Sequence, residues 1–190
     1  MTMTATFPSL AGHFLIAMPL MRDPHFAESV VYILTHDEQG ALGIIINRPS
    51  GLTLADVLEQ LQPEHATLSD SDDQDVFLGG PVQSELGFVL HNIGPQFQGT
   101  MNFGSLSLTS SQDALAAIAQ GQGPQQNLIA LGHAGWGAGQ LEEELRDNAW
   151  LSCPADPQVI FSTPIEQRRS AAAALLGVDL ERLSHQVGHA

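Results

Sequence analysis

Four glycines follow a short apolar run in the second half of the chain, within residues 132–140. An apolar strand, a glycine loop and then an amphipathic helix is the order found in phosphate sites, because glycines let backbone N–H groups approach an anion. The spacing here fits neither the P-loop nor G-x-G-x-x-G, and no Lys follows. Glu142, Glu143 and Glu144 occupy the first helical turn, where they complement the helix dipole and repel phosphate. We therefore expect a shaped turn that presents Trp136 and Gln140 to a partner, followed by a helix.

Two other segments carry residue types that could contact a ligand, each directly after a predicted strand. Asn47 and Arg48 precede a proline, a pattern typical of a turn in which Arg pairs with a local carboxylate. The alternative is an arginine at the mouth of a pocket, forked towards an anionic group. Gly79 and Gly80 allow either the close approach of a ligand or a sharp bend. These readings stay open in the sequence.

Known catalytic and metal signatures do not match the chain. There is no G-x-S-x-G elbow and no H-E-x-x-H motif. His185 and His189 have the spacing of two ligands on one helical face, but they flank a glycine near the end of the sequence, and we expect no metal there. Cys153 is expected to be a buried structural thiol, with a redox-sensing thiol as the alternative. No cofactor is expected.

The charge balance narrows the choice of partners. The 190 residues carry a net charge of −15, and all six basic residues are Arg. Because nucleic-acid affinity depends on neutralising phosphates with Lys and Arg, we expect no direct nucleic-acid binding. A single cysteine suits a reducing compartment, and no apolar run approaches membrane-spanning length, so we expect a cytoplasmic protein without membrane contact.

Hydrophobic patterning predicts a single α+β domain over residues 1–190. Apolar runs at consecutive positions indicate a sheet that is covered on both faces, with a hairpin joining residues 29–35 and 42–47. Residues 1–8 are expected to be flexible and residues 64–75 to form an acidic surface loop. Further strands are expected at residues 13–17, 76–78, 87–91, 105–108 and 158–161. Helices are expected from Leu54, after Ser110 or Ser111, and from a capping box at residues 163–166 that leads to Gly177.

Several motifs taken together resemble one family of bacterial proteins. They are G-H-F-L-I-A-M-P at 12–19, M-R-D-P at 21–24, S-V-V-Y at 29–32, N-R-P at 47–49, G-G-P-V at 79–82, G-F-V-L-H at 87–91, A-G-W at 134–136, G-Q-L-E at 139–142 and N-A-W-L at 148–151. In this order they identify the chain as similar to the YqgE/AlgH family over about residues 9–190. The resemblance implies a bifurcated mixed β-sheet folded into a pseudo-barrel with helices packed outside. It also brings the label of a transcriptional regulator, without an established reaction, cofactor or ligand.

The sequence departs from that family at three positions. Leu86 stands where the family often has Arg, His133 where an aromatic residue is usual, and Arg169 where Trp is common. The loss of an arginine beside Gly79 and Gly80 weakens the case for an anion site in that region.

Three functions follow as hypotheses. The first is a non-enzymatic cytoplasmic regulatory module that acts through a protein partner or a small ligand. The second is an enzyme or small-molecule-binding protein, which requires Arg48, Gly80, Trp136 and Gln140 to converge on one pocket. The third, a direct DNA-binding regulator, is disfavoured by the net charge of −15.

Overall fold

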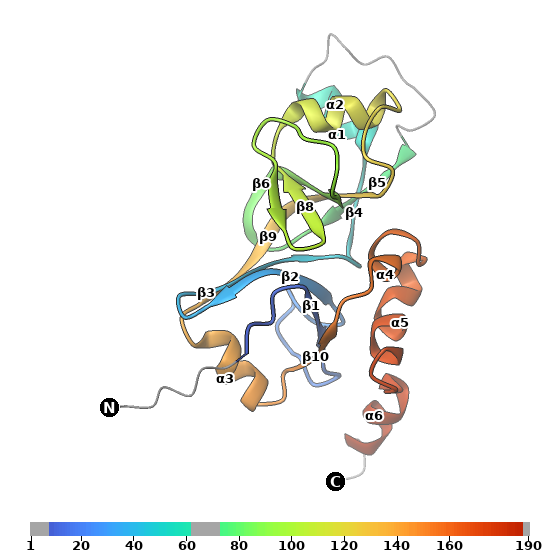
Figure 1. Cartoon of the computed structure of the whole chain (residues 1–190). Coiled ribbons are helices and arrows are strands. Elements are labelled where there is room, and N and C mark those ends of the chain that lie inside the picture. Colours follow the sequence, from blue (N-terminus) through green and yellow to red (C-terminus); the bar gives the residue numbers. More distant parts are fainter. Residues whose placement is uncertain (1–7, 62–72, 188–190) are drawn as a thin grey trace, which may run out of the picture.

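The N-terminal hydrophobic runs pair into antiparallel strands in a computed structural model that describes residues 8–61 and 73–187 (Figure 1). Strands β1 (His13–Ala17), β2 (Val30–Asp37) and β3 (Gly40–Ile45) are neighbours, and β10 (Trp150–Pro154) pairs with the outer edge of β1. The predicted hairpin is confirmed as β2 and β3, which pair from Val31↔Ile45 to Asp37↔Gly40.

Both faces of this part of the sheet are buried, as the unbroken apolar runs predict. Phe14, Ile16 and Tyr32 point to one face, which is covered by α4 (Pro157–Phe161), α5 (Arg168–Ala174) and α6 (Leu180–Val187). Leu15 and Val31 point to the other face, where α3 (Gln140–Arg146) packs. Figure 1 shows α4, α5 and α6 descending along one side of the molecule, with α3 beneath the sheet.

Strand β9 (Asn127–Gly137) joins this layer to a second lobe. Its final residues pair with β3, from Gly40↔Gly137 to Gly43↔Ala134, while its first residues pair with β6 (Val82–Asn92) and, in parallel, with β5 (Asp75–Leu78). The lobe is completed by β4 (Pro49–Thr53), β7 (Met101–Phe103), β8 (Leu106–Thr109), α1 (Leu54–Leu61) and α2 (Gln112–Ala119). We call this the α1–α2 lobe.

The two helices of the α1–α2 lobe cover one face of its strands. Val76, Val89 and Ile129 supply the sheet side of this small core, and Leu54 and Leu115 supply the helix side. The predicted fold class is thus confirmed: one α+β domain whose mixed sheet forks at β9 and curls into a half-barrel, with helices outside.

Three local expectations were wrong. Residues 158–161 are helical, because Asp156 caps α4 by accepting a hydrogen bond from the Gln158 amide at 2.9 Å and Pro157 occupies the first helical position. The capping box at 163–166 does not form; the Thr163 hydroxyl instead donates to the Gln158 carbonyl. The helix expected there is divided into a 3₁₀ turn, η3 (Ile165–Gln167), and α5, with Gly177 beyond it at φ +69°.

Other expectations concern residues outside the described ranges, wholly or in part. Most of the proposed flexible start (1–8) and of the acidic loop (64–75) lies outside the described residues, as does His189 of the His185/His189 pair. Asp75, at the end of that expected loop, is the first residue of β5. Across 8–61 and 73–187, no helix is long and apolar enough to cross a membrane.

Candidate functional site

The side chains of Asn47 and Arg48 bind the backbone of the loop at residues 24–28 and do not line a pocket described below. The Asn47 side chain accepts from the Val30 amide and donates to the Glu28 carbonyl, both at 2.9 Å. Arg48 donates to the backbone carbonyls of Pro24, His25 and Ala27, the last at 2.8 Å. Its planar fork is thereby committed to main-chain oxygens, neither to the local carboxylate nor to the anionic ligand considered from the sequence.

Gly79 and Gly80 let two segments of backbone meet. A Cβ atom on Gly79 would lie 2.3 Å from the Gly132 carbonyl oxygen, and one on Gly80 would lie 2.1 Å from the His133 carbonyl carbon. The close approach that these glycines permit is therefore to β9. No room for a ligand is implied by their small size.

Trp136 and Gln140 lie in a different setting from the expected loop. The glycine-rich residues up to Gly137 are the end of β9, where Trp136 pairs with Ala41 and its side chain is only 5% exposed. Gln140 begins α3 and accepts from the Gly137 amide at 3.0 Å. The helix expected after the glycines is confirmed, but the turn that presents Trp136 is not.

None of the three cavities described below brings together the four residues of the small-molecule hypothesis. Phe26 lies against Trp136, with ring centroids 5.8 Å apart, and belongs to the loop that Arg48 holds. This loop lies between Arg48 and Trp136. The three cavities described below contain none of Arg48, Gly80, Trp136 or Gln140 in their linings.

Cys153 is buried on β10, and its thiol donates to the Ala172 carbonyl at 3.7 Å. Burial raises the pKa of the Cys153 thiol above its ordinary value, because the thiolate would be poorly solvated. Attack on an oxidant requires the thiolate, so this environment favours the structural reading over redox sensing.

Sequence reasoning did not identify Arg168 as a buried residue. Its guanidinium lies over the Phe77 ring, 4.9 Å from the centroid, and donates to the Thr163 and Ile46 carbonyls. Burial lowers the pKa of Arg168, while the nearby Asp75 carboxylate opposes that shift. A polar cavity of about 290 Å³ borders Arg168 and Asp75, but the Arg168 guanidinium already donates to two backbone carbonyls.

A larger and more apolar hollow lies in the α1–α2 lobe, lined by residues of α1, α2, β4, β6 and β9. This hollow, here called the groove, has a volume of about 430 Å³. Its apolar lining is Leu52, Val57, Leu61, Leu86, Leu115 and Leu131, together with the segments 84–87 and 110–112. Leu61 and Leu86 are 44% and 43% exposed, which is high for leucines beside a core.

Gly87 forms the floor of the groove. A Cβ atom there would meet only the Leu115 Cδ1 atom, at an ordinary contact distance of 3.9 Å. The missing side chain therefore leaves usable space above the sheet. Unlike Gly79 and Gly80, this glycine could carry a larger residue without striking the backbone.

One edge of β6 is open beside the groove. Strand β8 pairs with β6 only from Val89↔Thr109 to Asn92↔Leu106, after which the chain turns into α2. On its other side, the register between β6 and β9 shifts between Val82 and Gly87, with Gln83 at φ +50°. Among the described strands, none continues along the β8 side of residues 82–88.

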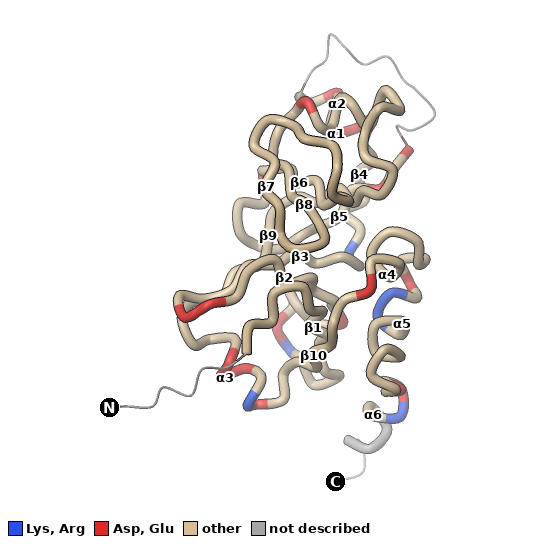
Figure 2. The backbone as a smooth tube through the Cα atoms, viewed as in Figure 1, with Lys and Arg blue, Asp and Glu red and all other residues tan. Residues whose placement is uncertain are grey.

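The charges around the groove are of one sign. Lys and Arg are absent from residues 49–145 of the sequence. Glu85 lines the groove, Asp56 and Glu59 lie on α1, and Asp113 lies at the start of α2. The tube in Figure 2 carries acidic but no basic segments around α1 and α2. This surface attracts cations and repels phosphates.

The side chains that line the groove suit contact better than catalysis. Its only titratable lining residue is Glu85, and its three serines have no histidine or lysine beside them in that lining. Activation of a serine requires a neighbouring base. Ser111 instead donates to the Asp113 carboxylate, and this hydrogen bond is the main cause of the lowered pKa of Asp113.

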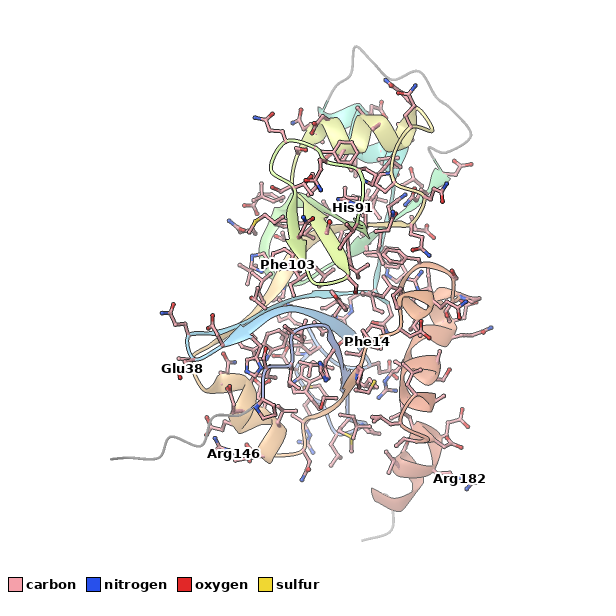
Figure 3. All side chains as sticks on the ribbon, in the orientation of Figure 1. Phe14, Glu38, His91, Phe103, Arg146 and Arg182 are labelled. Carbon is pink, nitrogen blue, oxygen red and sulfur yellow. The ribbon has the colours of Figure 1, made fainter. Side chains whose placement is uncertain are left out.

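A third cavity, of about 470 Å³, lies below the sheet between the segment 18–22 and the segment 147–149. It carries both a basic and an acidic residue, Arg22 and Asp147, and no strand edge adjoins it in its lining. Figure 3 shows the side chains of both lobes, with His91 in the α1–α2 lobe and Phe14 in the core below. The groove is the stronger candidate, because it combines apolar lining, exposure and an open strand edge.

One indirect sign of the groove is present in the sequence, namely the departure at Leu86. The lining residues come from four separate parts of the chain, 52–61, 84–87, 110–115 and Leu131, that no local pattern connects. The departure at Arg169 is explained differently: its guanidinium donates to the Ala17 carbonyl at 2.8 Å and so ties α5 to β1.

Comparison with known proteins places these features in a family. A family model described as AlgH-like matches residues 14–181. The UPF0301 protein of Stutzerimonas stutzeri is 59% identical over 189 residues, covering 99% of this chain and 100% of that protein. The UPF0301 protein AlgH of Pseudomonas aeruginosa is 58% identical over 181 residues, covering 95% and 96%.

Solved structures agree with the fold. The solution structure of the AlgH protein from Pseudomonas aeruginosa matches with a TM-score of 0.80 at 54% identity, covering 100% of this chain and 99% of that one. A crystal structure of a protein from Corynebacterium diphtheriae matches with a TM-score of 0.70 at 20% identity, covering 94% and 92%. At that identity the second likeness concerns the fold alone.

Proposed function

We propose that this chain, which belongs to the AlgH-like family, is a non-enzymatic module that binds a basic protein partner in the groove of its α1–α2 lobe. The observation that carries the proposal is the apolar groove itself, with two exposed leucines at its rim and an acidic surround. Exposed apolar surface of this kind marks interaction sites in soluble proteins.

The charge distribution supports a protein partner with Lys or Arg at its surface. Electrostatic complementarity accelerates encounter and selects among partners more than it adds affinity. A regulatory effect on transcription, as the family label suggests, would pass through that partner, since a surface with net charge −15 repels DNA. We place this activity in the cytoplasm, where a single reduced cysteine is expected.

The small-molecule alternative has less support. Its four residues are occupied by backbone contacts or buried, as described above, and the polar cavity beside Arg168 is flanked by the Asp75 carboxylate. A ligand in this polar cavity could not rely on Arg168 for hydrogen bonds, because its guanidinium already donates to two backbone carbonyls.

Site-specific photo-crosslinking in living cells tests the proposal. A photoreactive residue in place of Leu86 should trap a discrete partner, and the same residue in place of Leu175, which is 45% exposed at the end of α5 and does not line the groove, should not. Adding the substitution Gly87→Leu, whose Cβ atom would meet only Leu115, should fill part of the groove and abolish trapping from position 86. Equal trapping from both positions, or trapping that survives Gly87→Leu, would rule out the groove.

A further inference from the structure

The edge of β6 is the part of the groove that can recognise a backbone. Strand β8 occupies this edge as far as Val89↔Thr109, and the chain then leaves the sheet at Ser110 to form α2. From Phe88 back to Val82 the position of the next strand is therefore vacant among the described strands. Ser84 to Gly87 also line the groove, so the vacant position and the apolar hollow adjoin each other.

Unpaired strand edges bind extended chains through main-chain hydrogen bonds, at a spacing of about 4.8 Å between strands. Alternate side chains of an added strand point to opposite faces of the sheet. One set would therefore enter the space above Gly87, between Leu115 on α2 and the leucines of α1 and β4. The other set would face away from the helices.

Charge selects the sequence of such a strand. Glu85 lies on the strand edge itself, Asp113 stands at the start of α2, and Glu59 lies on α1. The absence of Lys and Arg from residues 49–145 leaves these carboxylates without a basic side chain from their own lobe's sequence. Lysine or arginine residues that flank the apolar side chains of a partner would satisfy them.

We propose that the occupant of the groove is an extended segment of the partner that adds to the open edge of β6 as a strand, placing one set of alternate apolar side chains in the groove and basic residues at its ends near Glu85 and Asp113. This inference rests on the proposed function and specifies its partner: a linear segment with apolar residues at alternate central positions and basic residues at both ends, recognised mainly through its backbone.

A labelled peptide of about ten residues, with valine at alternate central positions, threonine between the valines and lysines at both ends, tests this binding mode by fluorescence anisotropy with the full-length protein. We expect saturable binding that weakens with added salt. Gly87→Leu should weaken it about tenfold because it fills the groove and leaves every charge in place. Leu175→Ser, far from the groove, should leave the affinity unchanged.

A second peptide separates strand addition from simple charge attraction. N-methylation of alternate amides removes the donors of one strand edge and keeps the charge, so the peptide methylated on its pairing edge should bind at least tenfold more weakly. In parallel, amide hydrogen exchange at residues 84–88 should slow when the unmodified peptide binds. Equal binding of both methylated forms, with no protection of residues 84–88, would overturn strand addition.

The two proposals can fail separately. In one outcome, crosslinking from position 86 traps a partner, Gly87→Leu abolishes this trapping, and the two methylated peptides bind equally well. In that case the groove binds a folded surface, and only the strand mode is wrong. If the crosslinking depends on neither position and the peptide binds Gly87→Leu as well as the unmodified protein, both proposals are wrong. A glutamate-for-lysine peptide that binds equally well would overturn the basic partner.

Discussion

Trp136 and Trp150 donate their indole N–H groups to the same atom, Oε2 of Glu144, at 2.9 and 2.8 Å. The two rings meet edge to face with centroids 6.1 Å apart, and both side chains are buried. One carboxylate on α3 thus satisfies a donor from β9 and a donor from β10. This is the contact through which α3 joins two strands that are not neighbours in the sheet.

Replacement of Glu144 by Ala should lower the free energy of unfolding by about 2 to 4 kcal/mol, since each buried donor left without a partner costs about 1 to 3 kcal/mol. Urea unfolding followed by circular dichroism measures the change. Glu143→Ala, at an exposed neighbouring position, is the matched control and should change stability by less than about 0.5 kcal/mol. An equal effect of both variants would contradict the shared role of Glu144.

The contact between His36 and Glu142 should make stability depend on pH. His36 Nδ1 accepts from the Leu10 amide at 3.0 Å, and its Nε2 atom lies 2.7 Å from Glu142 Oε1. Burial raises the pKa of Glu142, but its own backbone amide and His36 outweigh burial, so the pKa lies below the ordinary value of 4.5. A carboxyl with a lowered pKa contributes stability above its unfolded pKa and loses it as pH falls through the folded pKa.

Glu142→Gln should therefore destabilise the protein at pH 7 and have a smaller effect at an acidic pH below its lowered folded pKa, where the carboxyl of the unmodified protein is protonated as well. Denaturant titrations at both pH values give the two differences. Glu143→Gln serves as the control. A destabilisation by Glu142→Gln that is the same at both pH values would show that its charge plays no part.

Gly80→Ala should prevent folding or lower stability by more than about 3 kcal/mol. Its Cβ atom would lie 2.1 Å from the backbone of His133, and the residue has a φ of +155°. Gly139→Ala provides a control with a positive φ of +75° and nothing within 4 Å, so its cost should be only about 1 kcal/mol. Thermal unfolding compares them, and similar losses would mean that crowding against β9 is unimportant.

Cys153 should resist thiol reagents in the folded protein. Burial raises the pKa of the Cys153 thiol above its ordinary value, so the neutral thiol predominates in the folded protein, and the resulting stability, fully present below the unfolded pKa, is lost as pH rises through the folded pKa. The rate of reaction with a disulfide reagent at pH 8 should rise by orders of magnitude when urea unfolds the chain. Rapid stoichiometric reaction without denaturant would restore the redox hypothesis.

The buried strands could be predicted because their signals are local. Residues 13–17 and 29–35 carry consecutive β-branched or aliphatic side chains, and these are the residues that fill the cores on both faces of the sheet. Helix α1 could likewise be predicted, because apolar residues follow Leu54 at helical spacing. In these elements propensity, periodicity and burial agree.

The errors arose where local signals conflict. Glycines at 135 and 137 suggested a loop, yet they alternate with Ala134 and Trp136, and this period of two is that of a strand with one buried face. The apolar run Val159 to Phe161 suggested a strand at residues 158–161, although the Asp-Pro pair before it is a helix start. Apart from the departure at Leu86, the groove had no local signal, because its walls meet only through the packing of α1 and α2 on the sheet.

The pairing of β1 with β10 has a consequence for synthesis of the chain. His13 aligns with Pro154 and Ala17 with Trp150, so one edge of β1 stays vacant until roughly 140 further residues have left the ribosome. At about 5 to 20 residues per second, the synthesis of these residues takes roughly 7 to 28 seconds. During that interval Phe14, Leu15 and Ile16 lack their final neighbours, and a nascent chain of this protein is an expected client of ribosome-associated chaperones.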